Sequence, residues 1–393
     1  MKIIPGLSHA RLAVAVLFAA GCGVAHAQPP IAPGELVAPE VGVVGGNVTL
    51  TVRPSVAGRS YKLEYSGTLE DDTWQDPGVV RVGDGNDLAI TTPYEPLMPR
   101  RIYRLVLDGP PAAAPTPAGF EQIPAGSFSM GDSLDGEYVP VHSVYVSAFF
   151  MEKYEVSKAL WDSVRTWGLT HGYTDLPAGS GKATNHPVQS ITWYAMVKWC
   201  NARSEKDGLT PCYTLAGAVY RTTNSNAVVC NWAAGGYRLP TEAEWEKAAR
   251  GGLSGKRFPW GNTISHSQAN YYSDNWLFKY DVSPTREYHP TYATGDYPFT
   301  SPVGSFAANG YGLYDMAGNV WEWCWDWFSF SYYSSSPGSD PRGAASGSTR
   351  VVRGSSWGGF ANGCGVAYRF DDYFFSDRSD YLVGFRPARS SVP

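Results

Sequence analysis

The sequence predicts an α+β fold with few regular elements, preceded by a small all-β module. Trp321–Trp327 places a tryptophan at every second position, the period of an extended strand with one aromatic face. Thr241–Arg250 opens with Thr241 and, three residues later, Glu244, which is the capping-box pattern of a helix start. The 43 Gly, 25 Tyr and 14 Trp residues favour a loop-rich fold packed by aromatic side chains over a helical bundle.

Residues 1–27 have the pattern of a secretory signal peptide. Positive charges precede the short apolar run Leu12–Ala20, and an A-x-A cleavage site follows at Ala25–Ala27. Lipoprotein processing at Cys22 is a less favoured alternative, because the third residue before it, Ala19, is not a bulky aliphatic. No other segment resembles a membrane span, so we expect a secreted or periplasmic protein.

Residues 28–108 predict a small β-sandwich, and Gly109–Ala118 predicts a Pro/Ala linker to a second domain at 119–393. The module has segments that alternate apolar and polar residues between Gly-, Asp- and Asn-rich turns, namely Asn47–Val52, Tyr61–Tyr65, Leu88–Thr91 and Ile102–Leu107. No residue of the module indicates chemistry. A formal charge of -5 gives no reason to expect nucleic acid or an anionic membrane as a partner.

The second domain should contain three helices, each with a Ser or Thr at its start: Ser157–Trp167, Thr192–Ala202 and Thr241–Arg250. Between the last two helices, Cys212 and Cys230 bracket a hairpin-like polar segment. In an exported protein such a pair predicts a disulfide. Cys200, Cys324 and Cys364 remain, and a bridge between the last two is left open.

Two carboxylates flank one turn in the tryptophan-rich region. Asp315 and Glu322 lie on either side of Ala317–Asn319, whose backbone carbonyls can point inward. Carboxylates and main-chain oxygens around one turn suit a hard cation such as Ca²⁺. The alternative is that Asp315 caps the turn and Glu322 pairs with a distant arginine. Spacing alone does not favour either.

Five motifs together resemble the formylglycine-generating enzyme (sulfatase-modifying factor) family. In chain order they are GYRLPTEAEWEKAARGG, FPWGN, GLYDMAGNVWEW, RVVRGSSW and GFRPAR. The resemblance covers Phe120 to Arg389. It implies a formylglycine-generating-enzyme-type, C-type-lectin-like fold for the second domain.

The resemblance also implies two calcium sites. The second maps onto the side chains of Asp315 and Glu322 and the carbonyls of Gly318 and Val320, which favours calcium there over a simple turn cap. The first would use Asn270 and Tyr271, then Asp296 and Tyr297. At this point Gly295-Asp296-Tyr297 stands where the family has Asp-Gly-aromatic, so the carboxylate is displaced by one residue.

Members of this family use O₂ and Cu⁺ to convert a sulfatase cysteine, within Cys-x-Pro-x-Arg, to formylglycine. Two cysteines hold the copper, because soft Cu⁺ prefers thiolates. Here Cys364 matches the second copper cysteine and Ser356 matches a serine near the active centre, but Gly359 stands at the first cysteine. A copper oxidase acting on an exported sulfatase is therefore the alternative function, and a buried core thiol is the simpler interpretation of Cys364.

The C-terminal region alternates family motifs with patches that look interchangeable. The patch residues are of types that adaptable binding surfaces use: Gly358, Gly359, Phe360, Asn362, Phe370, Asp371, Asp372, Tyr373, Phe374, Phe375, Ser379, Asp380 and Tyr381. The pattern resembles the variable region of diversity-generating retroelement target proteins; the alternative is an irregular loop. We expect an exported, calcium-stabilised protein that binds an unidentified protein or cell-surface ligand through this surface.

Overall fold

The computed structural model describes residues 116–134, 140–370 and 376–391, together with seven strands nearer the N-terminus. The chain divides into two compact units, Met1–Pro115 with Val392–Pro393, and Thr116–Ser391. The predicted signal segment and linker lie largely outside the described residues, as do Asp371, Asp372, Tyr373, Phe374 and Phe375.

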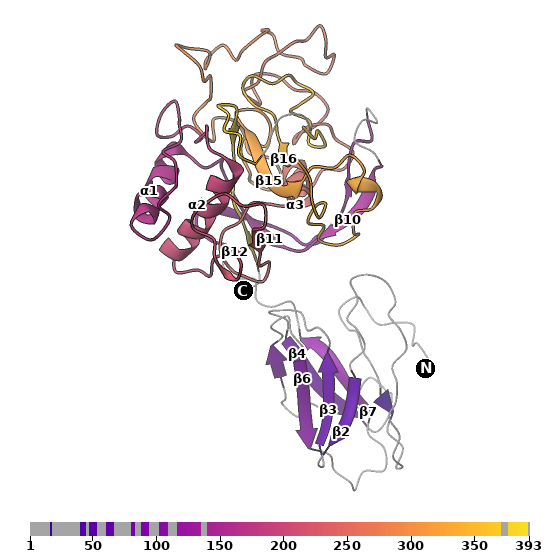
Figure 1. Cartoon of the computed structure of the whole chain (residues 1–393). Helices are drawn as coiled ribbons and strands as arrows, with labels where there is room; N and C mark the ends of the chain where they lie inside the picture. Colours follow the sequence, from indigo (N-terminus) through magenta and orange to yellow (C-terminus); the bar gives the residue numbers. More distant parts are fainter. Residues whose placement is uncertain are drawn as a thin grey trace. The chain divides into compact units, whose positions relative to one another are not determined.

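The first unit contains two small sheets, whose strands Figure 1 draws in indigo and purple. One has the order β1-β7-β4-β5 and the other β2-β3-β6, with antiparallel pairing throughout. Val48, Leu50 and Ile90 of one sheet and Leu63 of the other are fully buried, as alternation predicts. The strands are β1 (Val16–Leu17), β2 (Glu40–Val44), β3 (Asn47–Val52), β4 (Ser60–Ser66), β5 (Val80–Val82), β6 (Leu88–Pro93) and β7 (Ile102–Asp108).

The second unit is a mixed α/β structure with three helices and several small sheets in its described part. Figure 1 shows β15 and β16 side by side, with α1 and α2 together on one side. The helices are α1 (Lys158–Leu169), α2 (Trp193–Lys206) and α3 (Glu242–Arg250), with a 3-10 turn at Tyr332–Ser334. The strands are β8 (Phe120–Ile123), β9 (Gly126–Met130), β10 (His142–Val146), β11 (Phe149–Glu152), β12 (Tyr213–Leu215), β13 (Ala218–Val219), β14 (Val229–Cys230), β15 (Trp321–Trp327), β16 (Arg350–Arg353), β17 (Val383–Gly384) and β18 (Ala388–Ser390).

All three predicted helices are confirmed, together with their caps. The hydroxyls of Ser157 and Thr192 accept the backbone N–H groups of Leu160 and Ala195. The capping box of α3 is complete, with Thr241 and Glu244 each accepting the backbone N–H of the other. These local bonds satisfy helix-end donors that would otherwise be unpaired, which is why the sequence located the helices.

The tryptophan-rich strand β15 is confirmed, with the tryptophans on one face as the alternation predicts, but burial is not confined to that face. It pairs with β16 on one side and with β17 on the other. Glu322, Cys324 and Asp326, on the face opposite the tryptophans, are also buried. Charged and polar partners cover that face, so the strand lies between two packed layers.

Buried ion pairs connect α3 to the C-terminal segments. Arg353 Nη2 donates to Glu246 Oε2, and Arg369 Nε donates to Glu242 Oε1 at 2.6 Å. All four residues are at most 4% exposed. A guanidinium buried in this way needs a carboxylate to offset its desolvation, so these pairs fix the loop after β16 against α3. No helix in the described part of the chain is long and apolar enough to cross a membrane.

Candidate functional site

The candidate site is built on the loop that follows β16, residues 354–370. Backbone bonds attach this loop to two distant segments. Gly318 N–H donates to the Gly354 carbonyl at 2.7 Å, Trp357 N–H donates to the Asn319 carbonyl at 2.8 Å, and Tyr272 N–H donates to the Gly359 carbonyl at 2.9 Å. The loop therefore lies against both the 317–319 turn and the 270–272 segment.

Asn319 holds the centre of this arrangement. It is fully buried and has a positive φ of 63°, a conformation that asparagine tolerates better than most residues. Its Nδ2 donates to Glu155 Oε2 at 2.6 Å, and its Oδ1 accepts the Ser301 N–H at 2.9 Å. The Asn319 side chain therefore connects the 317–319 turn to Glu155, which follows β11, and to Ser301.

Aromatic side chains cover this centre and form what we call the aromatic surface: Tyr272, Tyr288, Tyr297, Phe299, Trp357, Phe360 and Tyr381. Trp357 is its buried base, stacked on Tyr297 with ring centroids 5.2 Å apart and packed on Tyr381 at 6.0 Å. Phe360 meets Tyr272 edge-on at 5.3 Å. Tyr297, Tyr381 and Phe360 are 59%, 49% and 43% exposed, so solvent reaches a continuous group of rings.

Only part of this surface was predicted as ligand-facing. Phe360 and Tyr381 were; Tyr272, Tyr288, Phe299 and Trp357 were missed, and Tyr297 was named only as a calcium ligand. The abundance of tyrosine between 264 and 300 was the available signal. Without strand or helix periodicity there, nothing in the sequence located those rings beside residue 360.

The remaining predicted patch residues are distributed differently. Phe370 packs on Trp321, with ring centroids 5.1 Å apart, and is only partly exposed. Ser379 is exposed, whereas Asp380 accepts the Leu382 N–H at 2.9 Å and pairs with Arg378 at 3.1 Å. Gly358 and Gly359 are half-buried, beside the aromatic surface.

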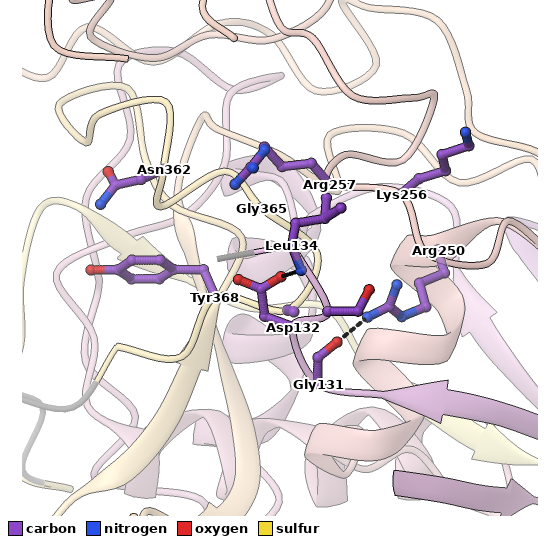
Figure 2. A pocket seen from close by; sticks show the side chains of 11 residues that line it. Gly131, Asp132, Leu134, Arg250, Lys256, Arg257, Asn362, Gly365 and Tyr368 are labelled. Atoms are coloured by element: carbon purple, nitrogen blue, oxygen red, sulfur yellow. Dashed lines mark hydrogen bonds between the residues drawn. The ribbon is translucent and has the colours of Figure 1, made fainter. Parts of the chain in front are cut away.

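Asn362 lines a separate hollow with Tyr368. Figure 2 shows these two on one side and Lys256 and Arg250 on the other, with Arg257 between them. The hollow has a volume of about 30 Å³, and a second, beside Asp315, of about 10 Å³. Pockets that enclose small ligands are roughly ten times larger. Neither of these two hollows in the described part of the chain can enclose a metabolite.

The copper position contains one thiol. Cys364 is fully buried, and burial raises the pKa of its thiol to about 12. The Gly318 N–H and the Ser355 side chain oppose that rise, although the Ser355 hydroxyl does not reach a hydrogen bond of normal geometry. Ser356 is also buried, with no hydrogen-bond partner for its hydroxyl among the described residues. The residues present do not fit a two-thiolate copper site.

The other cysteines do not supply the missing thiolate. Cys324 packs in the cluster around Trp245, whereas Cys364 packs in a different cluster with Phe258 and Tyr271. All five cysteines from Cys200 onward are unbridged in this structure.

The predicted pair Cys212 and Cys230 lies on neighbouring segments. Tyr213, and not Cys212, stands opposite Cys230, so the two cysteines are offset by one position along the strands. Both thiols are buried, and each is free here. A bridge between them stays a prediction for the oxidised protein.

The second calcium position is a buried acidic cluster. Glu322 accepts Arg386 and also Trp245 Nε1, and Asp315 Oδ2 accepts the Gly304 N–H at 2.6 Å. These are the interactions of the structural alternative, a turn cap and a distant arginine. Burial raises the pKa of Asp315 to about 6, opposed by the Gly304 N–H and Arg386.

The same cluster still carries excess negative charge. Glu155 joins it, and burial followed by repulsion from Asp315 and Glu322 raises the pKa of Glu155 well above its usual value. Arg386 is the cation that lies among the three carboxylates in this described region. Asp315 Oδ1 and Asn270 Oδ1 are buried without a hydrogen-bond partner. The free Asp315 oxygen could therefore bind a cation, whereas both oxygens of Glu322 already accept hydrogen bonds from Arg386 and Trp245.

The first calcium position is less complete. Asn270 is buried and pairs with Gly318, but Asp296 and Tyr297 are exposed at the surface. No group of three or more His, Cys, Asp or Glu side chains in the described residues is arranged to hold a metal ion. The Asp296 carboxylate is therefore exposed, whereas Asn270, the other predicted side-chain ligand of this calcium site, is buried.

Comparisons with known proteins agree on one family. Residues 109–391 match the family described as Sulfatase-modifying factor enzyme 1-like domain. The formylglycine-generating enzyme of Streptomyces coelicolor is 33% identical over 310 residues, covering 72% of this chain and 93% of that protein. The mouse (Mus musculus) formylglycine-generating enzyme is 33% identical over 293 residues, covering 69% and 75%.

Solved structures give the same result. Treponema denticola variable protein 1 is similar with a TM-score of 0.55 and 30% identity, covering 69% of this chain and 94% of that one. CarF is similar with a TM-score of 0.53 and 25% identity, covering 70% and 99%. By sequence and by structure, the chain belongs to the formylglycine-generating enzyme, or sulfatase-modifying factor, family.

Proposed function

We propose that this protein is an exported binding protein that uses the family fold as a scaffold and does not oxidise sulfatase cysteines. The observation that carries the proposal is the pair of positions 359 and 364. Gly359 supplies no thiol, and Cys364 is fully buried with a pKa raised to about 12. A copper oxidase needs two thiolates at this point, and the chain offers one thiol, which is buried and protonated at neutral pH when no metal is bound.

The aromatic surface supports the binding role. Its seven side chains carry no formal charge. Its tyrosines add hydroxyl groups that can form hydrogen bonds, as the hydroxyls of Tyr288 and Tyr297 do with each other at 3.2 Å. Rigid aromatic side chains give large contact area at low entropic cost, which suits adaptable recognition. We propose a protein or cell-surface ligand whose contact region is largely uncharged, held on a C-type-lectin-like framework.

Calcium and export belong to the same proposal. A Ca²⁺ ion would be held by Asp315 with the backbone carbonyls of Gly318 and Val320, and it would offset the excess charge of the acidic cluster. The Glu322–Arg386 pair would then brace this site and not coordinate the ion. Export would use the segment 1–27, in which a short apolar run precedes an A-x-A site.

We also propose that the C-terminal patches are diversified. The similarity to a protein named Treponema denticola variable protein 1 supports this idea. A reverse-transcriptase gene near this protein's gene, and a template repeat with Asn codons at the patch positions, would be expected. A genome lacking both would refute diversification and leave the binding proposal standing.

The binding role is tested with variants of the exposed rings. A glycan array and a surface-displayed peptide library serve as probes, with wild type compared with Tyr297→Ser and Phe360→Ser. Phe330→Ser is the matched control, because Phe330 is 75% exposed and lies outside the aromatic surface. Binding that the two site variants lose and the control keeps would support the proposal. Binding that all three variants keep would place the ligand elsewhere.

A further inference from the structure

A side chain at Gly359 would collide with one residue, Ser355, whose hydroxyl would have to move. A Cβ built on Gly359 would lie 2.3 Å from Ser355 Oγ, whereas its next contact, Ser356 N, is at 3.5 Å. Real Cβ atoms essentially never approach a heavy atom within 3.0 Å. The backbone of Gly359 is outside the left-handed region, so its conformation would accept another residue. The obstacle is the Ser355 side chain alone.

The backbone conformation and the burial of Ser355 are both unfavourable for a serine. It is fully buried, and its φ of 69° is in the left-handed region, where glycine is favoured and serine is strained. Its hydroxyl has no hydrogen-bond partner of normal geometry, which is costly for a buried polar group. The Ser355 hydroxyl lies beside Gly359 and the Cys364 thiol, so this side chain fills the space between those two positions.

The space that Ser355 fills lies between positions 359 and 364. Its hydroxyl faces Gly359, would also lie 2.8 Å from a Cβ on Gly363, and influences the Cys364 thiol. A thiol at position 359 would have to begin where the Ser355 hydroxyl now lies. Restoring the first cysteine alone would therefore overpack the loop.

We infer that Ser355 closes the position of the missing copper thiolate, so that this chain can acquire a two-thiolate Cu⁺ site only when Ser355→Gly and Gly359→Cys are made together. Ser355→Gly removes the blocking hydroxymethyl group and suits the positive φ. Gly359→Cys then has room for its side chain, beside Cys364. The inference rests on the correspondence of Gly359 to a copper cysteine, and not on what the wild-type surface binds.

Five purified proteins test it, with two readouts: the melting temperature, and the Cu⁺ affinity measured anaerobically by competition with bathocuproine disulfonate. The melting temperature of Gly359→Cys should be lower than that of wild type by roughly 2–4 °C or more, and its Cu⁺ affinity should not rise. The double variant should recover that loss and bind Cu⁺ at least about tenfold more tightly than wild type, since it offers two thiolates. Adding Cys364→Ala to the double variant should remove the gain.

Gly358→Cys is the matched control. A Cβ on Gly358 meets only Leu382 Cδ2, at 3.4 Å, so a cysteine there should melt like wild type. The inference is overturned if Gly359→Cys alone melts like this control and binds Cu⁺ as tightly as the double variant. It is equally overturned if the double variant melts no higher than Gly359→Cys or binds Cu⁺ no more tightly. None of these results depends on whether wild type forms aldehyde, which is the separate test of the proposed function.

Discussion

Arg386 forms a buried salt bridge with Glu322, which lies 64 residues earlier in the chain. Its Nε and Nη2 donate to both carboxylate oxygens at 2.7–2.9 Å, and its Nη1 donates to the carbonyls of Glu152 and Lys153. Arg386 is fully buried and Glu322 is 1% exposed. The pair joins β15 to the C-terminal segment beneath the 315–320 turn, so the geometry of the candidate site depends on it.

Removing one partner of this pair should destabilise the second unit strongly. Glu322→Gln removes the carboxylate that accepts hydrogen bonds from Arg386 Nε and Nη2, and one amide oxygen cannot replace both acceptors. Because these donors are buried, we expect a loss of about 3–5 kcal/mol in the free energy of unfolding. Urea denaturation followed by tryptophan fluorescence measures it. The control is Asp162→Asn, which breaks the more exposed Lys158–Asp162 pair on α1 and should cost no more than about 0.5 kcal/mol. Equal effects of the two variants would contradict the structural role of Glu322.

Calcium should stabilise the protein through Asp315. Three carboxylates share one arginine in the acidic cluster, so a bound cation relieves their repulsion. At about one hundred times Kd, calcium should raise the melting temperature by roughly 5–10 °C, and EDTA should reverse the rise. Asp315→Asn should abolish the shift, and Asp162→Asn should keep it. A melting temperature that neither calcium nor EDTA changes would refute the calcium proposal.

Cys364 should be unreactive in the folded protein. With a pKa raised to about 12, only about one thiol in ten thousand is ionised at pH 8, against roughly one in ten for a cysteine with the ordinary pKa of about 9. Iodoacetamide should therefore label Cys364 about a thousandfold more slowly in the folded protein than in urea, as peptide mass spectrometry can show. Rapid labelling at pH 8 in the folded state would identify an accessible thiolate, as an oxidase needs.

The same shift has a consequence for stability at high pH. The unfolded thiol ionises near its ordinary pKa of about 9, whereas the folded thiol holds its proton until about 12. Between these values the folded state binds more protons, so this thiol's contribution to stability is lost as pH rises. Cys364→Ser, compared with wild type by urea denaturation at pH 7 and 10.5, should show a smaller pH-dependent loss. An identical loss in both proteins would contradict the shifted pKa.

Within the aromatic surface, the rings should divide by burial. Trp357 is 3% exposed, and Trp357→Ala should cost about 3–5 kcal/mol of folding free energy. Tyr297 is 59% exposed, so Tyr297→Ser should lower the free energy of unfolding by less than about 1 kcal/mol. Urea denaturation of both variants decides this. If the two losses were equal, Tyr297 would belong to the core and would not be free to meet a ligand.

Local patterns predicted the regular elements well. The Thr241–Glu244 capping box and the alternation of Trp321–Trp327 each need only a few neighbouring residues, so the sequence was enough to find α3 and β15. The burial of Glu322 was not predicted, because it depends on Arg386, which lies 64 residues away.

The candidate site was harder to predict for the same physical reason. Tyr272 and Phe360 meet across loops that have no periodicity, through one backbone bond at Gly359. The sequence revealed that Gly359 lacks a thiol. It did not reveal that Ser355 fills the space, since that follows from a single short contact between the two residues.

The central claim is that the family fold serves here as a scaffold without oxidase activity. The most direct test incubates the purified mature protein with Cu⁺, O₂ and a Cys-x-Pro-x-Arg peptide, and looks for the aldehyde by mass spectrometry. A Cys364→Ala variant and the Streptomyces coelicolor enzyme, as a positive control, are run alongside. We predict no aldehyde from a protein whose melting curve shows it to be folded. Aldehyde that appears with wild type and disappears with Cys364→Ala would contradict the account, because one thiol would then suffice for catalysis.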